Sequence, residues 1–170
     1  MKLNVRELCF FGLLGALMYA SKAILATVPN VHLVGVFIVA VTAVYRQKAI
    51  WPIYVFVMLS GLLDGFGIWW FSYLYIWLPL WAAVMLLPRD MKPWVRAIVY
   101  MAICSLHGFL YGLMYLPVQA LVSGLCGSKL LAWYIAGLPY DLIHGVSNFF
   151  CGLLICPIIN VLNKIKRHER

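Results

Sequence analysis

Three polar side chains, Asp141, His144 and Asn148, lie close together in the apolar stretch GLPYDLIHGVSNFFCG, residues 137 to 152. Their spacing of three and then four residues stacks them on one face of a helix over two turns. A carboxylate accepts hydrogen bonds, whereas an imidazole and an amide both donate and accept them. An ionisable group in the middle of a membrane helix costs about 2.5 to 3.5 kcal/mol on insertion scales. We therefore expect this stripe to bind a ligand, and the alternative is a set of interhelical hydrogen bonds that fixes packing.

Four further polar residues are expected near the same end of the protein: Lys22, Asn30, His32 and Asp64. Lys22 and Asp64 either face the pocket or extend to the membrane interface, and the sequence leaves both alternatives open. Asn30 and His32 belong to a short loop where a lid over a pocket would lie. His107, in SLHGFLYG, is expected to make one interhelical hydrogen bond.

Aromatic residues crowd the segment DGFGIWWFSYLYIWLPLW, residues 64 to 81. One interpretation is an aromatic belt at the membrane surface. The other is a pocket wall that stacks against a flat ligand, because pockets are mostly apolar with a few polar groups. The candidate wall residues are Trp69, Trp70, Tyr73 and Trp77.

Motifs for phosphate-binding loops, dinucleotide binding, zinc proteases and hydrolase nucleophiles are missing from the sequence. The five cysteines show no CxxC spacing and are interpreted as small hydrophobic residues. We therefore expect no catalytic residue, no metal site and no cofactor in this chain. An intramembrane enzyme built on Asp141 and His144, a stand-alone carrier using Asp64 or Asp141 as a proton site, and a purely structural subunit remain alternatives.

Composition places these residues in a membrane. The chain of 170 residues is 65% hydrophobic and 11% charged, whereas soluble domains are about a quarter charged. The fold class is therefore all-α integral membrane, with residues 1–170 forming one domain of six transmembrane helices. Charged clusters and Pro, Gly or Asn breaks predict helices at about 6–27, 31–45, 49–64, 68–88, 94–117 and 139–163.

Basic residues predict the orientation, because Lys and Arg in short loops stay in the cytoplasm. Of thirteen basic residues, only Lys22 and Lys129 fall outside the two termini and the two expected inner loops. The N- and C-termini are therefore expected to be cytoplasmic. The net charge of +8 then reflects topology and contact with anionic lipid in the bilayer, and no nucleic acid partner is expected.

The first apolar segment carries small residues at Gly12, Ala16 and Ala20, a spacing that lets another helix approach closely. Together with the pattern above, the segments GLLGALMYASKAIL (12–25), VPNVHLV (28–34) and GLPYDLIHGVSNF (137–149) give the chain a family resemblance. It resembles the substrate-binding S components of energy-coupling factor (ECF) vitamin transporters, over essentially its whole length.

The resemblance implies a multi-pass protein of a prokaryotic plasma membrane that captures a vitamin or related micronutrient at its outer face. It also implies partners: a membrane coupling subunit, which would meet Gly12, Ala16 and Ala20, and two ATPase subunits that use the ATP. The patterns of the riboflavin, thiamine, biotin and folate proteins are not clearly visible. A heterocycle or a corrinoid such as cobalamin would suit the expected pocket.

Overall fold

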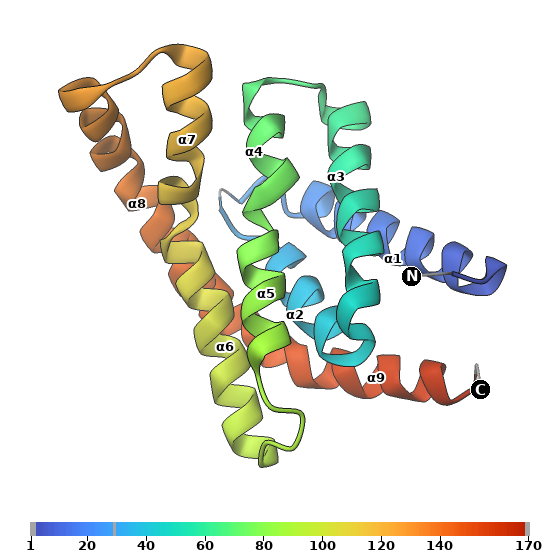
Figure 1. Ribbon diagram of the computed structural model, residues 1–170. Helices are drawn as coiled ribbons and strands as arrows, with labels where there is room; N and C mark the ends of the chain where they lie inside the picture. The colour runs from blue at the N-terminus through green and yellow to red at the C-terminus, as the bar shows by residue number, and fades with distance from the viewer. Residues whose placement is uncertain (1–2, 29, 169–170) are drawn as a thin grey trace.

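The computed structural model describes residues 3–28 and 30–168, and within them every regular element is helical (Figure 1). Lys2 and Arg170, which the sequence assigns to the basic end, lie outside the described residues. The elements are α1 (Val5–Ile24), α2 (Val34–Tyr45), the 3₁₀ turn η1 (Arg46–Ala49), α3 (Ile50–Asp64), α4 (Ile68–Ile76), α5 (Leu78–Leu86), α6 (Pro93–Phe109), α7 (Tyr111–Ser123), α8 (Gly127–Cys151), the 3₁₀ turn η2 (Gly152–Leu154) and α9 (Ile155–His168).

Local sequence explains several helix ends. Asn4 caps α1: its side chain accepts from the Glu7 amide at 2.8 Å, and the Glu7 carboxylate accepts from the Asn4 amide. Pro93 begins α6, where its missing N–H is not needed. Gly124 follows α7 at a φ of +63°, the left-handed geometry that glycine adopts without strain.

Five helical stretches are long and apolar enough to cross a membrane: Val5–Ile24, Val34–Asp64, Ile68–Leu86, Pro93–Ser123 and Gly127–Arg167. The second of these contains both α2 and α3. Helix α2 has only 12 residues, and almost all of them are buried. It packs against α5 and α9, so the core of the protein is built around it.

Two ion pairs show how α1 and α3 run relative to each other. Glu7 pairs with Lys48 near the first residues of both helices, and Lys22 pairs with Asp64 at 2.7 Å near their last residues. The two helices therefore run in the same general direction, with α1 crossing α3 at an angle (Figure 1), and the chain must reverse through α2 between them. Lys166 of α9 donates to the Val44 carbonyl at 2.6 Å, so the C-terminal helix ends near the same end as Glu7. Figure 1 shows both chain ends on one side of the molecule.

Helix boundaries differ from the prediction in the second half of the chain. The predicted helix 68–88 is divided into α4 and α5, and the predicted 94–117 is divided into α6 and α7, which continues to Ser123. The predicted connection before residue 139 was wrong, because α8 begins at Gly127 and passes through Pro139. Membrane helices tolerate such a proline since neighbouring groups can satisfy the freed backbone. Asp141 therefore lies in the middle of α8 and not in its first turn.

Candidate functional site

Five aromatic and imidazole rings meet where α4, α6, α7 and α8 converge on the segment before α2. We call these residues the histidine cluster: His32, Trp77, His107, Tyr111 and His144. His144 has the ring centroids of His32 and Tyr111 each 4.6 Å from its own, both edge to face. Trp77 stacks on His107 with centroids 5.6 Å apart. Each ring is thus held by at least one neighbour from another part of the chain.

Interruptions of the helices place these side chains at the same depth in the protein. Trp77 is the residue between α4 and α5, and Tyr111 begins α7 directly after the break at Leu110. His107 stabilises the first break, because its Nε2 donates to the Ile76 carbonyl oxygen at 2.8 Å. The interhelical hydrogen bond expected of His107 is thereby confirmed.

The histidine cluster has buried polar atoms without hydrogen-bond partners. His144 is 1% exposed, and neither of its ring nitrogens has a partner among the described residues. A hydrogen-bond partner among the described residues is also missing for Nδ1 of His32, Nδ1 of His107 and Nε1 of Trp77. A buried polar group without a partner costs about 1 to 3 kcal/mol. The cluster therefore holds unused donors and acceptors, which a bound ligand would satisfy.

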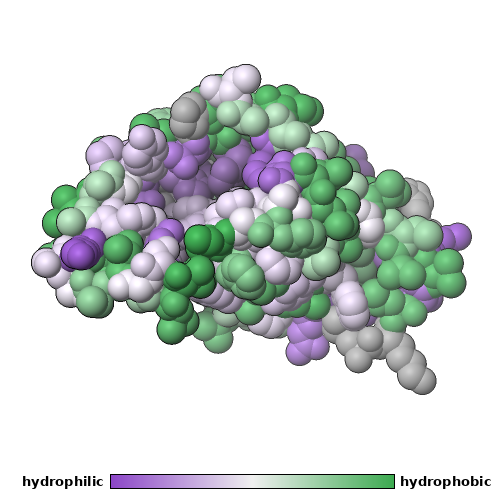
Figure 2. Space-filling view, turned by 90° about the horizontal axis from the view of Figure 1, so that it is seen from above, coloured by the Kyte–Doolittle hydropathy of each residue, from purple (hydrophilic) through white to green (hydrophobic). Residues whose placement is uncertain are grey.

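A cavity of about 400 Å³ lies beside the cluster, toward the end of the protein that carries the α3–α4 and α7–α8 connections. Figure 2, seen from that end, shows a hollow with hydrophilic surface gathered in it. The cavity is lined by Tyr19, Lys22, Ala23, Ala26, Asp64, Trp69, Tyr73 and Tyr115. We call it the aromatic cavity.

Ring contacts join the aromatic cavity to the histidine cluster. Tyr73, in the cavity wall, has its centroid 5.3 Å from that of Trp77. Tyr115, another lining residue, has its ring centroid 5.3 Å from that of Tyr111. The two sites therefore share a continuous aromatic lining.

Charged side chains stand at the wall of the aromatic cavity. The Lys22 ammonium donates to Asp64 at 2.7 Å, and the Tyr19 hydroxyl donates to the other carboxylate oxygen at 2.7 Å. The ammonium also lies 5.1 Å from the Trp69 ring centroid and 5.4 Å from that of Tyr73, within cation–π range. Lys22 and Asp64 therefore both line the cavity, and their extension to the membrane interface stays a prediction.

Asp141, His144 and Asn148 are all buried on one face of α8. Asp141 has a protein partner: its carboxylate accepts from the Gly112 amide at 2.9 and 3.1 Å, in the first turn of α7. Asn148 donates to the Cys104 carbonyl at 3.3 Å, whereas its Oδ1 has no partner within the described ranges. Of the stripe, His144 is the residue with the most unused hydrogen-bonding capacity.

The remaining predicted residues divide between the site and its surroundings. The carbonyl of Asn30 accepts from the Ser147 hydroxyl at 3.0 Å, which ties the loop before α2 to α8. Trp70 donates to the Val57 carbonyl at 2.9 Å and does not line the aromatic cavity. Trp69, Tyr73, Trp77 and His32 lie in the cavity wall or the cluster.

The sequence analysis did not predict that Tyr19, Tyr111 and Tyr115 belong to the aromatic cavity or the histidine cluster. It predicted only a packing role for His107. A signal was present, because His107, Tyr111 and Tyr115 follow one another at a spacing of four residues. This spacing would place three rings on one helical face.

Burial lowers the pKa of His32 to about 4, and the nearby His107 and Lys22 charges add to this effect. The imidazole is therefore neutral at pH 7, with one nitrogen able to accept a hydrogen bond.

Residues 3–28 and 30–168 contain no group of three His, Cys, Asp or Glu side chains placed to hold a metal ion. The described side chains of the site offer hydrogen bonding and ring stacking.

The chain matches no family model, no curated protein and no solved structure in the comparisons made with them.

Proposed function

We propose that this chain is the substrate-binding subunit of an ATP-driven importer of the energy-coupling factor type. In this proposal it captures a vitamin-like small molecule in the aromatic cavity and delivers it inward with a coupling subunit and two ATPase subunits. The observation that carries the proposal is His144, a buried imidazole with both nitrogens unused, which is linked to the aromatic cavity through the rings of Tyr111 and Tyr115. A purely structural subunit would have no need of such a group.

The lining favours a flat heterocycle with a polar edge. The cavity volume of about 400 Å³ falls within the range of about 300 to 1,000 Å³ that is usual for small-molecule sites. Trp69 and Tyr73 provide faces for stacking, and the Lys22–Asp64 pair provides one donor and one acceptor at the wall. The imidazole of His144 lies behind this lining, against Tyr111, and would meet a ligand only where it reaches past Tyr115 into the histidine cluster.

The outer face of α1 supports a docking role in the same proposal. Ala16 is exposed, and a side chain added at Gly12 would meet no atom within 4 Å. Internal packing of α1 uses a different residue, Gly15, which lies against Val55 and the Pro52 carbonyl of α3. The small-residue face at Gly12, Ala16 and Ala20 is therefore left for lipid or for a coupling subunit.

The shared general direction of α1 and α3 supports six membrane passes with both ends on one side. Arg46, Lys48, Arg89 and Lys166 border one cavity at the end that also holds Glu7 and Asn4. The excess of basic residues at this end favours a cytoplasmic location for it in a prokaryotic plasma membrane. The aromatic cavity then opens to the exterior.

Native mass spectrometry of the gently purified protein tests this proposal. We expect a retained molecule of vitamin size in the wild-type protein and its loss in His144→Phe. Protein that carries no such molecule, and whose melting temperature does not rise with any vitamin in a panel, would contradict the proposal. Uptake by cells that lack every coupling module would instead identify a stand-alone carrier.

A further inference from the structure

A second, larger cavity lies at the opposite end of the protein. Its volume is about 1050 Å³, and its walls come from α1, α2, η1, α5, the α5–α6 connection, α6 and α9. Six basic side chains line it, against the single carboxylate of Glu7. They are Arg6, Arg46, Lys48, Arg89, Arg96 and Lys166. We call this the basic cavity.

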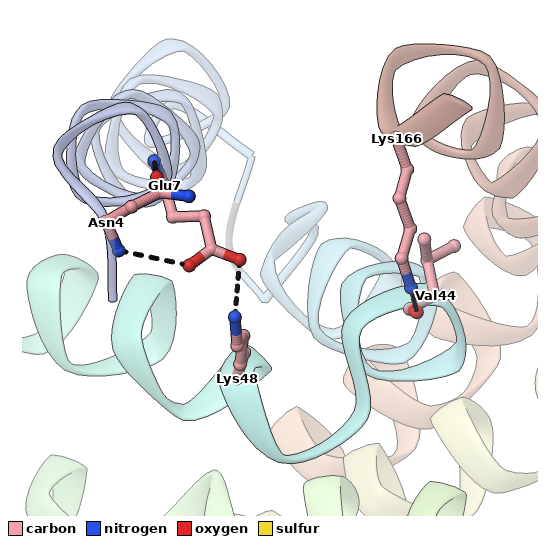
Figure 3. Close-up of polar contacts among 5 residues, drawn as sticks. All are labelled: Asn4, Glu7, Val44, Lys48 and Lys166. Carbon is pink, nitrogen blue, oxygen red and sulfur yellow. Dashed lines mark hydrogen bonds and ion pairs between the residues drawn. The ribbon is translucent and has the colours of Figure 1, made fainter. Parts of the chain in front are cut away.

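Part of this positive charge already has protein partners. Figure 3 shows Lys48 directed at the Glu7 carboxylate, which also accepts from the Asn4 amide, and Lys166 directed at the Val44 carbonyl. Arg46 donates to the Val84 carbonyl at 3.1 Å and to the Met85 carbonyl, so its guanidinium caps the end of α5. Its φ of +55° is unusual for a residue with a side chain, so packing holds this cation in place.

The other three arginines supply unmatched charge. Arg6, Arg89 and Arg96 have no hydrogen-bonding or ion-pair partner within the structure's described ranges, and Nε of Arg96 is buried. A buried donor of a charged group without an acceptor is costly. A guanidinium presents its donors in a planar fork that matches two oxygens of a phosphate. The missing acceptor is therefore best supplied by an oxyanion.

We propose that the basic cavity binds a phosphate-bearing anion. Arg96 supplies the buried donor at the wall, and Arg6 and Arg89 supply the exposed charges beside it. This proposal rests on the cavity alone and does not depend on the proposed transport function.

The surroundings favour a phosphate that belongs to a membrane lipid. Basic pockets between membrane helices on the cytoplasmic side bind anionic lipid head groups. The helices that form the walls of the basic cavity also carry exposed apolar side chains, for example Val5 (78% exposed) on α1, Trp94 (65%) on α6 and Val161 (56%) on α9. Acyl chains of a lipid with its head group in the cavity can lie along these faces. A free phosphate would use the same arginines without the apolar contacts.

Native mass spectrometry distinguishes the two sources. The protein is exchanged into detergent and titrated with phosphatidylglycerol, with phosphatidylcholine and, separately, with inorganic phosphate. The variants are Arg96→Gln and the double variant Arg6→Gln/Arg89→Gln, whose two side chains are exposed and carry no packing. Arg167→Gln is the matched control, because Arg167 is an exposed basic residue of α9 that does not line the cavity.

We expect phosphatidylglycerol to bind at least tenfold more tightly than phosphatidylcholine, and both sets of variants to lose that preference. Arg167→Gln should keep it. Binding of inorganic phosphate with the same variant dependence, without a lipid preference, would support the proposal and identify a free anion as the source. If neither phosphatidylglycerol nor inorganic phosphate binds, or if Arg167→Gln loses the lipid preference to the same extent, the proposal is overturned. Unchanged melting temperatures show that the double variant is folded.

Discussion

The rings of His32 and His144 lie edge to face with their centroids 4.6 Å apart, although 112 residues separate them in the chain. His32 comes from the segment before α2, and His144 from the middle of α8. Their contact joins the two halves of the protein within the histidine cluster. His144 has no partner for either nitrogen among the described residues, so under the proposed function we expect ligand binding to be sensitive to substitution at this contact.

Replacing His144 with Phe should remove ligand binding and preserve the fold. The phenyl ring has a similar shape and keeps the contacts with Tyr111 and His32, and no hydrogen bond of the unliganded protein is lost. We expect affinity to fall at least tenfold, about 1.4 kcal/mol. Isothermal titration calorimetry measures the affinity, and thermal melting in detergent measures the stability.

The matched control is His107→Phe. This change removes the hydrogen bond to the Ile76 carbonyl and leaves that buried oxygen without its donor, so stability should fall by about 1 to 3 kcal/mol. Equal destabilisation by the two substitutions would show that His144 serves packing alone.

Much of the first half of the fold was predictable from sequence. The predicted ends at residues 45 and 64 are confirmed, because Arg46, Lys48 and Asp64 mark where apolar runs stop. The all-helical character follows from the same apolar runs. The later boundaries were not predictable in this way, because a proline such as Pro139 is a helix start in one context and an interior residue in another.

The sequence was sufficient to predict which residues of α8 share a face, but not which residues of other helices they contact. The spacing of Asp141, His144 and Asn148 correctly places them on one buried face. The partner that each one meets depends on how the helices are arranged: Asp141 meets the Gly112 amide, 29 residues away. Such contacts are set by tertiary packing, which a single helical pattern does not contain.

Substitution of Asp141 separates its packing role from a ligand role. Asp141→Ala should lower stability by about 1 to 2 kcal/mol, because the first turn of α7 loses its acceptor. Asp141→Asn keeps an acceptor oxygen and should remain close to wild type in thermal melting. If Asp141→Ala instead weakens ligand binding at unchanged stability, the carboxylate belongs to the binding site.

Substitution by valine should lower the stability of the protein at Gly15 of α1 but not at Gly12 of the same helix. Gly15→Val should destabilise the protein by about 1 to 3 kcal/mol, because even its Cβ would lie 2.9 Å from the Pro52 carbonyl oxygen. Gly12→Val meets open space and should leave stability unchanged. In the proposed function, Gly12→Val should also reduce co-purification with the coupling subunit; retained co-purification would exclude this face as the contact.

The stability of the protein should fall as the pH is lowered through the range from 6.5 to 4. The folded state holds the pKa of His32 at about 4, below its ordinary value of 6.5, so the unfolded state binds more protons in this range. His32 therefore contributes stability that is complete above pH 6.5 and is lost as the pH approaches 4. Between pH 7 and pH 5 the expected loss is about 1 to 2 kcal/mol.

Melting in detergent across this pH range measures the effect. His32→Gln, which has no titrating group, should flatten the dependence by that amount. A dependence as steep as in the wild type would assign the effect to other groups.

The interruptions of the helices have a mechanical consequence. The helical structure is interrupted at Trp77, between α4 and α5, and at Leu110, between α6 and α7. The ring contact between Trp77 and Tyr111 shows that the two interruptions lie at the same depth in the protein. On the cavity side of these interruptions lie the short helices α4 and α7, which contribute Trp69, Tyr73 and Tyr115 to the wall of the aromatic cavity. On their other side α5 and α6 pack against the buried α2. The part of the cavity wall formed by α4 and α7 is therefore joined along the chain to α5 and α6 at the buried base of the protein only through these two interruptions.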